Sequence, residues 1–207
     1  MKYLSVDQAY YGEIVIKKSR FISCVMPLET EPDARQNLED IRKKWPQAAH
    51  YCYAMILREP AAQKYSDDGE PSGTAGTPIL QVLKNFELKN VLAVVIRYFG
   101  GTLLGASGLV RAYSEAVITA LNQAHICEYM MCRIYTCSLE YSFWADIERN
   151  LVRSGSIRIK KIEFSSQVEL EILVPLEKED RIIDQLNAST NGSIKLRLSG
   201  EGYFPGI

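Results

Sequence analysis

The chain lacks any apolar run long enough to cross a membrane. Its longest such run, Val91 to Ile96, has six residues, whereas a membrane-spanning helix needs about 18–20. The N-terminus also lacks the basic segment followed by an apolar stretch that is typical of a secretory signal peptide. These absences argue against the membrane and secreted classes, and they predict a cytoplasmic protein without a membrane partner.

Cysteine and histidine are too few and too irregularly spaced for a familiar metal site. The five cysteines are odd in number and include no C-x-x-C pair, which argues against a disulfide framework. The interval between Cys127, Cys132 and Cys137 matches no common zinc or iron–sulfur pattern. We therefore expect packed, reduced thiols, with neither a metal nor a cofactor. A nucleophilic pair of Cys52 with His125 has only its residue types in its favour.

Charge of one sign is not in excess either. The net charge is −1. The first 131 residues carry 14 basic and 14 acidic side chains, and the remainder carries 10 basic and 11 acidic ones. A surface that binds nucleic acid would therefore have to be a local patch rather than a whole basic domain.

Hydrophobic periodicity and turn residues divide residues 1–131 into strands and helices. Thr30 and Asp33 resemble a capping box, with Pro32 in the first turn of the helix that follows. The elements expected are two strands within 12–26, a helix from about 31 to 45, a strand at 51–57, a long loop at 59–78, a strand at 90–99 buried on both faces, and a central helix at 109–124.

The pattern begins anew after Met131. We expect a strand at 133–139, a helix at 143–154 closed by Gly155, strands at 157–164 and 167–174, a helix at 178–188 and a final strand at 193–198. This β-α-β-β-α-β order is that of a ferredoxin-like domain. The sequence thus predicts an α+β protein with an N-terminal α/β domain over 1–131 and a ferredoxin-like domain over 132–207.

The first candidate site is the glycine-dense turn GGTLLGASG, which joins the buried strand to the central helix. Gly100, Gly105 and Ser107 fit the P-loop pattern, but Ala106 replaces the lysine that reaches the terminal phosphates. The turn is not a dinucleotide-binding G-x-G-x-x-G loop either. Two interpretations stay open. The glycines either permit a tight turn and nothing more, or they form an anion site at the helix N-terminus made of Arg97, Gly100, Gly101, Gly105, Ser107 and Arg111.

The second candidate is the acidic loop around Asp67, Asp68 and Glu70. Three carboxylates in four residues could ligate Mg²⁺ or act as an acid–base pair. Their spacing does not fit an EF-hand, no histidine lies nearby in the sequence, and the neighbouring glycine and proline residues are turn formers. A solvated acidic turn is the simplest interpretation. A third is that these acids pair with Arg97 or Arg111 and join the two loops into one structural unit.

Four segments together resemble the bacterial type of the IMPACT/YigZ family. They are KKSRF at 17–21, AHYCYA at 49–54, DDGEPSGTAGTPIL at 67–80 and RYFGGTLLGASGLVRAY at 97–113. Residues 133–204 are similar to the small C-terminal domain of the bacterial members, which itself resembles the last domain of elongation factor G. One departure is Ser107, which stands where the family usually has glycine.

This resemblance implies a fold and a cellular process rather than a reaction. The N-terminal domain is expected to resemble the second domain of a ribosomal small-subunit protein, a fold shared with a group of small-molecule kinases. The eukaryotic relatives regulate translation by binding the activator of an initiation-factor kinase. Their extra N-terminal interaction domain is not recognisable in this sequence, so that partner is not carried over.

The sequence therefore predicts a non-enzymatic binding protein that acts in the regulation of translation. Its ligand would be anionic: RNA, the ribosome or the acidic surface of a translation-related protein. The two-loop site would consist of the six residues of the glycine turn named above, with Asp67, Asp68 and Glu70 opposite them. The alternative is a Mg²⁺-dependent enzyme that acts on a nucleotide or another phosphorylated small molecule. A third possibility is a scaffold whose loops serve packing alone.

Overall fold

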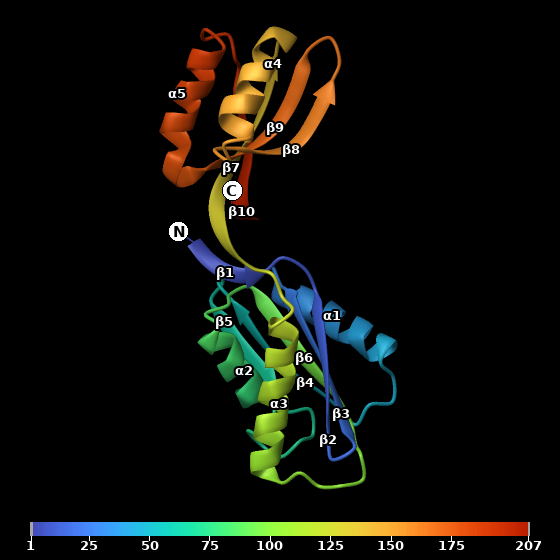
Figure 1. The fold of residues 1–207 in the computed structure, drawn as a ribbon. Coiled ribbons are helices and arrows are strands. Elements are labelled where there is room, and N and C mark those ends of the chain that lie inside the picture. Colours follow the sequence, from blue (N-terminus) through green and yellow to red (C-terminus); the bar gives the residue numbers. More distant parts are fainter. Residues whose placement is uncertain (1, 207) are drawn as a thin grey trace. The chain divides into compact units, whose positions relative to one another are not determined.

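The computed structural model describes residues 2–206, which fall into two compact units (Figure 1). The first unit runs from Tyr3 to Cys127, and the second runs from Glu128 onward together with Lys2. The short strand β1 (Lys2–Val6) opens the chain. Whereas the sequence suggested a boundary after residue 131, the units part after Cys127. This position lies inside β7 (Ile126–Leu139), a strand that begins earlier than its apolar pattern indicated.

A five-stranded antiparallel sheet forms the centre of the N-terminal unit. Its order is β2–β3–β6–β4–β5, and its strands are β2 (Tyr10–Ile16), β3 (Ser19–Pro27), β6 (Val91–Tyr98), β4 (His50–Leu57) and β5 (Ala62–Ser66). Only Lys17 and Lys18 separate β2 from β3, and their φ angles are 46° and 66°. Two successive positive φ angles are typical of the tightest hairpin turns.

Helices cover both faces of this sheet, which explains why its central strand β6 is apolar at almost every position. One face packs on α1 (Glu31–Lys44), and the other on α2 (Gly76–Asn85) and α3 (Ala106–Leu121). The expected capping box of α1 is confirmed, because Thr30 and Asp33 each accept a hydrogen bond from the other's backbone N–H. Alternate residues of β6 enter opposite cores: Val91, Ala93 and Val95 one, and Leu92, Val94 and Ile96 the other.

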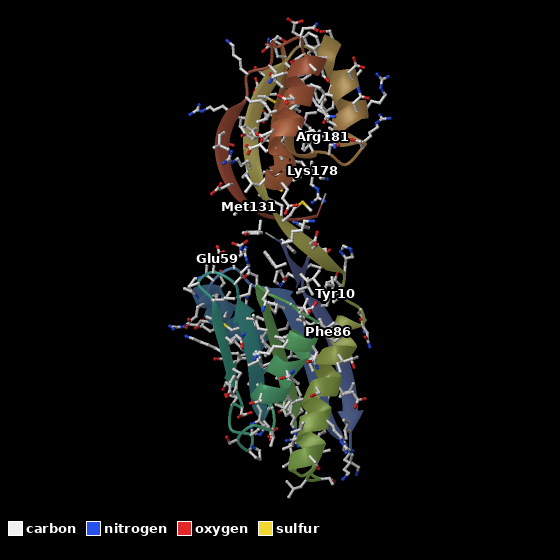
Figure 2. All side chains as sticks on the ribbon, turned by 90° about the vertical axis from the view of Figure 1, so that its left-hand side faces the viewer. Tyr10, Glu59, Phe86, Met131, Lys178 and Arg181 are labelled. Atoms are coloured by element: carbon white, nitrogen blue, oxygen red, sulfur yellow. The ribbon has the colours of Figure 1, made fainter. Side chains whose placement is uncertain are left out.

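α2 and α3 lie across one face of the sheet, as Figure 2 shows. Tyr10 and Phe86, both labelled there, are partly buried against the core on this face. α3 approaches β2 so closely that a Cβ on Gly12 would lie 2.6 Å from the backbone nitrogen of Ala120. The C-terminal part of α3 therefore lies beside the start of β2, and its N-terminus lies toward the β2–β3 turn.

The segment 59–78, expected to be one long loop, contains β5 and the beginning of α2. β5 escaped notice because its sequence, AQKYS, is polar and none of its side chains is fully buried. Gly76 and Pro78 resemble turn formers, yet both belong to the first turn of α2. Proline costs no hydrogen bond in the first turn, because the N–H groups there have no partner within the helix. A Cβ on Gly76 would lie 2.9 Å from the carbonyl of Ser66, so glycine is needed for packing.

The C-terminal unit has the predicted ferredoxin-like topology. In its sheet β10, β7, β9 and β8 pair antiparallel in that order, and β1 is a further neighbour of β7. After β7 the chain forms α4 (Tyr141–Ile147), β8 (Arg158–Phe164), β9 (Val168–Pro175), α5 (Glu179–Ser189) and β10 (Arg197–Pro205). The last strand was expected at 193–198 but begins at Arg197. Ile194 is buried in the core of this unit, but it belongs to the connection before the strand. The remainder of β10 was not predicted, because it contains Gly200 and Gly202 and glycine is uncommon inside strands. No helix among residues 2–206 is long and apolar enough to span a membrane.

Candidate functional site

The glycine-dense turn packs directly against the turn between β2 and β3. A Cβ on Gly100 would lie 2.1 Å from the carbonyl carbon of Lys18 and 2.2 Å from the nitrogen of Ser19. The Gly100 N–H donates to the Ser19 hydroxyl at 3.1 Å. Gly101 and Gly105 have φ angles of 82° and 74°, which L side chains adopt only with strain. Each of these three glycines thus has a backbone reason to be glycine.

The first turn of α3 is exposed and lacks a side-chain cap. Gly105 occupies the N-cap position, and no side chain among the described residues accepts a hydrogen bond there. Ala106, Ser107 and Arg111 are exposed. The first N–H groups of a helix have no partner within it and carry a partial positive charge. Arg111 lies one turn after Ser107 on α3, and helical side chains lean toward the helix N-terminus, so Arg111 belongs to the same end of the helix.

Arg97, by contrast, is buried and already has a partner. Its guanidinium contacts the Glu70 carboxylate at 2.6 Å and the Ser19 hydroxyl at 3.4 Å, and it lies 5.4–5.5 Å from the ring centres of Phe21 and Phe99. Arg97 and Glu70 are only 5% and 8% exposed. This ion pair joins the acidic loop to β6, so Arg97 supports the loops and does not present its charge to solvent.

Glu70 is further fixed by α3. The Tyr113 hydroxyl donates to the same Glu70 oxygen at 2.7 Å. Burial, together with the neighbouring Cys52 and Glu70, raises the pKa of Tyr113 far above its usual value, so the phenol remains protonated and serves as a donor. The interpretation in which the two loops form one structural unit is therefore confirmed for Glu70 and Arg97.

Asp67 is the cap of α2. Its carboxylate accepts hydrogen bonds from the backbone N–H groups of Gly73, Ala75 and Gly76 at 2.8–3.0 Å. Burial by itself raises the pKa of Asp67, but these three donors outweigh it, and the pKa lies below its usual value. Ala75, the residue before the helix, has no side chain able to cap it, so Asp67 performs that role from nine residues away.

Asp68 is also engaged within the fold. One carboxylate oxygen contacts the Arg42 guanidinium at 3.2 Å, and the other accepts from the Tyr51 N–H at 2.6 Å. The three acids thus have separate partners and do not converge on one point. No group of three or more histidine, cysteine or acidic side chains suited to a metal ion occurs among residues 2–206. Asp67, Asp68 and Glu70 therefore do not form the joint carboxylate site that the Mg²⁺-dependent alternative assumed.

His50, which is partly buried, and the buried Cys52 also contact this network. The His50 Nδ1 lies 2.8 Å from the Asp68 carbonyl oxygen and therefore donates to it, while Nε2 lies 3.8 Å from Glu70. The Cys52 thiol donates to the Asp67 carbonyl, and burial raises its pKa to about 12. His50 and Cys52 are two residues apart in a strand, so their side chains lie on one face of it. This spacing was the sequence signal that both contact the acidic loop.

The nucleophilic pair of Cys52 and His125 does not form. His125 is exposed, and its Nδ1 contacts the Asp7 carboxylate at 3.1 Å, whereas Cys52 is fully buried beside Tyr113. A thiol whose pKa is far above neutral is a poor nucleophile, because the thiolate is the reactive form. Nothing in this network supplies an activated nucleophile.

The surface residues that remain for a ligand are therefore Ser107, Gly101, Gly105 and Arg111, with the β2–β3 turn beside them. Lys17 and Lys18 form that turn, and both are exposed. Sequence analysis did not select them, because only the contact of Gly100 with Lys18 places them next to the glycine turn. We call this group of Lys17, Lys18, Arg111 and the first turn of α3 the basic end of the N-terminal unit.

Two domain families match the chain. The Impact N-terminal domain matches residues 17–121, and a domain of unknown function, DUF1949, matches residues 137–193. The IMPACT family member YvyE of Bacillus subtilis is 40% identical over 196 residues, which cover 94% of this chain and 90% of the relative. The family member YigZ of Escherichia coli is 35% identical over 184 residues, or 87% and 90% of the two chains. A crystal structure of a hypothetical protein superposes on 96% of this chain and 98% of its own, with a TM-score of 0.63 and 32% identity.

Proposed function

The chain belongs to the IMPACT family, and from that premise we propose that it is a non-enzymatic binding protein that regulates translation. Its ligand is the phosphate backbone of RNA, and the contact is made by the basic end of the N-terminal unit. Regulation of translation is what the family resemblance described in the sequence analysis implies. The similarity of residues 133–204 to the last domain of elongation factor G, which that resemblance also implies, supports the same process.

The observation that carries this proposal is the uncapped first turn of α3, which Arg111 follows on the helix and which the glycine turn connects to the exposed Lys17–Lys18 turn. Helix N-termini bind phosphate through their open N–H groups and their dipole, and Arg111 adds a forked donor suited to phosphate oxygens. Lys17 and Lys18 add charge from the adjoining turn. The nearby carboxylates do not oppose an anion, because Glu70 is neutralised by Arg97, Asp68 by Arg42, and Asp67 is hydrogen-bonded by three backbone donors.

The remaining predicted site residues support this surface from within. Gly100, Gly101 and Gly105 allow the turn to reach α3. Arg97 and Glu70 hold the acidic loop beneath it. In this proposal a loss of Arg97 impairs binding by loosening the loops, whereas a loss of Arg111 removes a direct contact.

The test is RNA affinity measured across a range of salt concentrations with the full chain. Arg111→Ala and the double variant Lys17→Asn/Lys18→Gly are expected to weaken binding, and to reduce the slope of log K against log salt by about 0.7 for each lost contact to single-stranded RNA. Asparagine and glycine suit the positive φ angles of this turn, so the double variant removes charge without disturbing the hairpin.

Arg181→Ala is the matched control, because Arg181 is exposed on α5 in the other unit. It removes the same charge and is expected to leave both the affinity and the salt slope unchanged. Equal weakening by Arg181→Ala would mean that net charge alone attracts RNA, and an unchanged affinity in both variants of the basic end would refute the site.

A further inference from the structure

β2 is an edge strand of the N-terminal sheet, and its outer backbone edge is open. It pairs with β3 alone, and Ile16 opposite Ser19 is the pair that closes the two-residue turn. In such a hairpin the closing pair is hydrogen-bonded, and hydrogen-bonded pairs then alternate along the ladder. Ile16, Ile14, Gly12 and Tyr10 therefore bond to β3. The backbone N–H and C=O groups of Tyr11, Glu13 and Val15 point outward.

Nothing in the N-terminal unit covers this edge. In Figure 1, β2 and β3 lie in front of β6 and β4, with α3 on one side and α1 on the other. Beyond the ladders and helices, no described backbone hydrogen bond involves Tyr11, Glu13 or Val15. An open edge of this kind is a template for a further strand, and natural proteins usually block it. Here three outward residues, spaced about 7 Å apart, remain available.

The side chains of the same three residues lie on the face of the sheet that α1 covers only in part. Tyr11 is 40% exposed and Val15 is 63% exposed, although side chains of this kind are usually buried against other residues. Between them, Glu13 is held by two hydrogen bonds from Arg20 at 2.7 and 2.8 Å. A groove of about 280 Å³ runs along this part of the strand, and Tyr11, Glu13, Arg20 and Trp45 are among the residues that line it.

The charge around this edge is positive. The Lys44 ammonium lies 4.2 Å from the Tyr11 ring centre and 4.4 Å from that of Trp45, so a cation stands over the two rings. Lys17 and Lys18 follow directly after β2. The one acid of the hairpin, Glu13, is already neutralised by Arg20. An occupant of the edge therefore meets three uncompensated cations.

We propose that the β2 edge receives an extended peptide strand from a partner protein, which carries both acidic and apolar side chains on the face toward α1. The open amides and carbonyls match the backbone of another strand, which is how peptides join exposed sheet edges. Successive side chains of a strand point to opposite faces, so every second peptide residue meets the face of Tyr11, Val15 and Lys44. Apolar side chains of this set would pack beside Tyr11 and Val15, and acidic ones would meet Lys44 and the Lys17–Lys18 turn. RNA has no backbone group that matches alternating N–H and C=O groups. This surface shares Lys17 and Lys18 with the basic end, but the first turn of α3 and Arg111 do not belong to it.

The first experiment uses a capped heptapeptide with glutamate at positions 1 and 7, valine at positions 3 and 5, and threonine at the others; the control peptide has lysine in place of glutamate. Amide hydrogen exchange of the full chain is followed residue by residue. The glutamate peptide is expected to slow exchange at Tyr11, Glu13 and Val15, while Gly12 and Ile14 stay as they are because they already bond to β3. The lysine peptide is expected to leave all five unchanged. Slower exchange at Ala106 to Gly108 instead would overturn the proposal.

The second experiment uses a pair of variants at one position. Glu13→Pro removes an outward N–H that the β2–β3 ladder does not use, and proline is tolerated at such a position of an edge strand. Glu13→Gln removes the charge alone. Glu13→Pro is expected to weaken peptide binding about tenfold, and Glu13→Gln to leave it intact or improve it. Lys44→Gln is expected to weaken it a few fold and to reduce its salt dependence.

Two other occupants of the edge are outcomes of the same tests. If the chain self-associates in ultracentrifugation and Glu13→Pro makes it monomeric, the edge is an interface between copies and the proposal is overturned. It also fails if RNA displaces the glutamate peptide and itself protects the amides of Tyr11, Glu13 and Val15. The RNA affinity of Glu13→Pro is expected to equal that of the unmodified chain, so failure here is distinct from failure of the basic end.

Discussion

Glu70 and Arg97 form a buried ion pair with an N–O distance of 2.6 Å, and the Tyr113 hydroxyl donates to the same carboxylate oxygen. The pair joins the acidic loop, the central strand β6 and the helix α3. Its two charges offset each other in a place where either alone would be costly, since a buried ion without a partner destabilises a fold far more than a surface charge does.

The first prediction concerns the removal of one member of this pair. Arg97→Met is expected to lower the free energy of unfolding by about 3–5 kcal/mol, because Glu70 is left charged and buried. Urea unfolding followed by circular dichroism measures this. Arg97→Met/Glu70→Gln is expected to recover part of the loss, because a neutral amide can still accept from Tyr113.

Tyr113→Phe is the control for packing around the pair. It removes one hydrogen bond and is expected to cost about 1 kcal/mol. A double variant no more stable than Arg97→Met alone would show that lost packing by the arginine side chain, rather than the isolated charge, is responsible.

A second prediction follows from Asp67 as the cap of α2. Asp67→Ala is expected to lower the free energy of unfolding by about 1–2 kcal/mol near neutral pH, as loss of an N-terminal cap does. The pKa of Asp67 in the folded chain lies below its ordinary value of 3.8. Its contribution is therefore complete above that value and is lost as the pH falls through the lower folded pKa.

Unfolding of both proteins between pH 6 and pH 2 tests this relation. The difference in stability is expected to shrink as the solution becomes more acidic. Asp40→Ala, at an exposed ion pair on α1, is expected to have almost no effect at any pH. A difference for Asp67→Ala that stayed constant down to pH 2 would contradict the role of the charged carboxylate.

The sequence predicted the buried strand β6, the capping box at Thr30 and the ferredoxin-like order of the second unit, because each depends on local periodicity or on neighbouring residues. It did not predict β5, whose stability comes from pairing with β4 rather than from its own polar residues. Local pattern was also misleading at Pro78, since a proline in the first turn of a helix and one in a loop look alike in sequence.

The candidate site shows the same division. Sequence analysis offered pairing of the acids with Arg97 or Arg111 as one interpretation. It did not identify which acid pairs with which arginine, because Glu70 and Arg97 are 27 residues apart. Of the two arginines that flank the glycine turn, Arg111 is exposed and Arg97 is buried. Lys17 and Lys18 were visible in the sequence as a basic dipeptide, yet only the packing of Gly100 against their turn relates them to α3.

A third prediction distinguishes two glycines of the same turn. Gly100→Ala would place a Cβ 2.1 Å from the carbonyl carbon of Lys18, where backbone on both sides prevents relaxation. It is expected to cost about 3 kcal/mol or more. Gly101→Ala would meet nothing within 4 Å, and its positive φ of 82° alone is expected to cost about 1 kcal/mol. Thermal unfolding of the two variants measures the order, and equal losses would contradict the close approach of the two turns.

A final prediction concerns the reactivity of Cys52, which lies next to His50 on one face of β4 and could be mistaken for a nucleophile. Burial raises its pKa to about 12, so about one molecule in ten thousand carries a thiolate at pH 8, and the sulfur is fully buried. Iodoacetamide at pH 8 is therefore expected to modify Cys52 only as fast as the fold opens, with a rate that rises with urea. Cys127, which is partly exposed, is expected to react first. Rapid labelling of Cys52 in the absence of urea, detected by peptide mass spectrometry, would mean that its thiolate is accessible. Cys52 would then again be a candidate nucleophile.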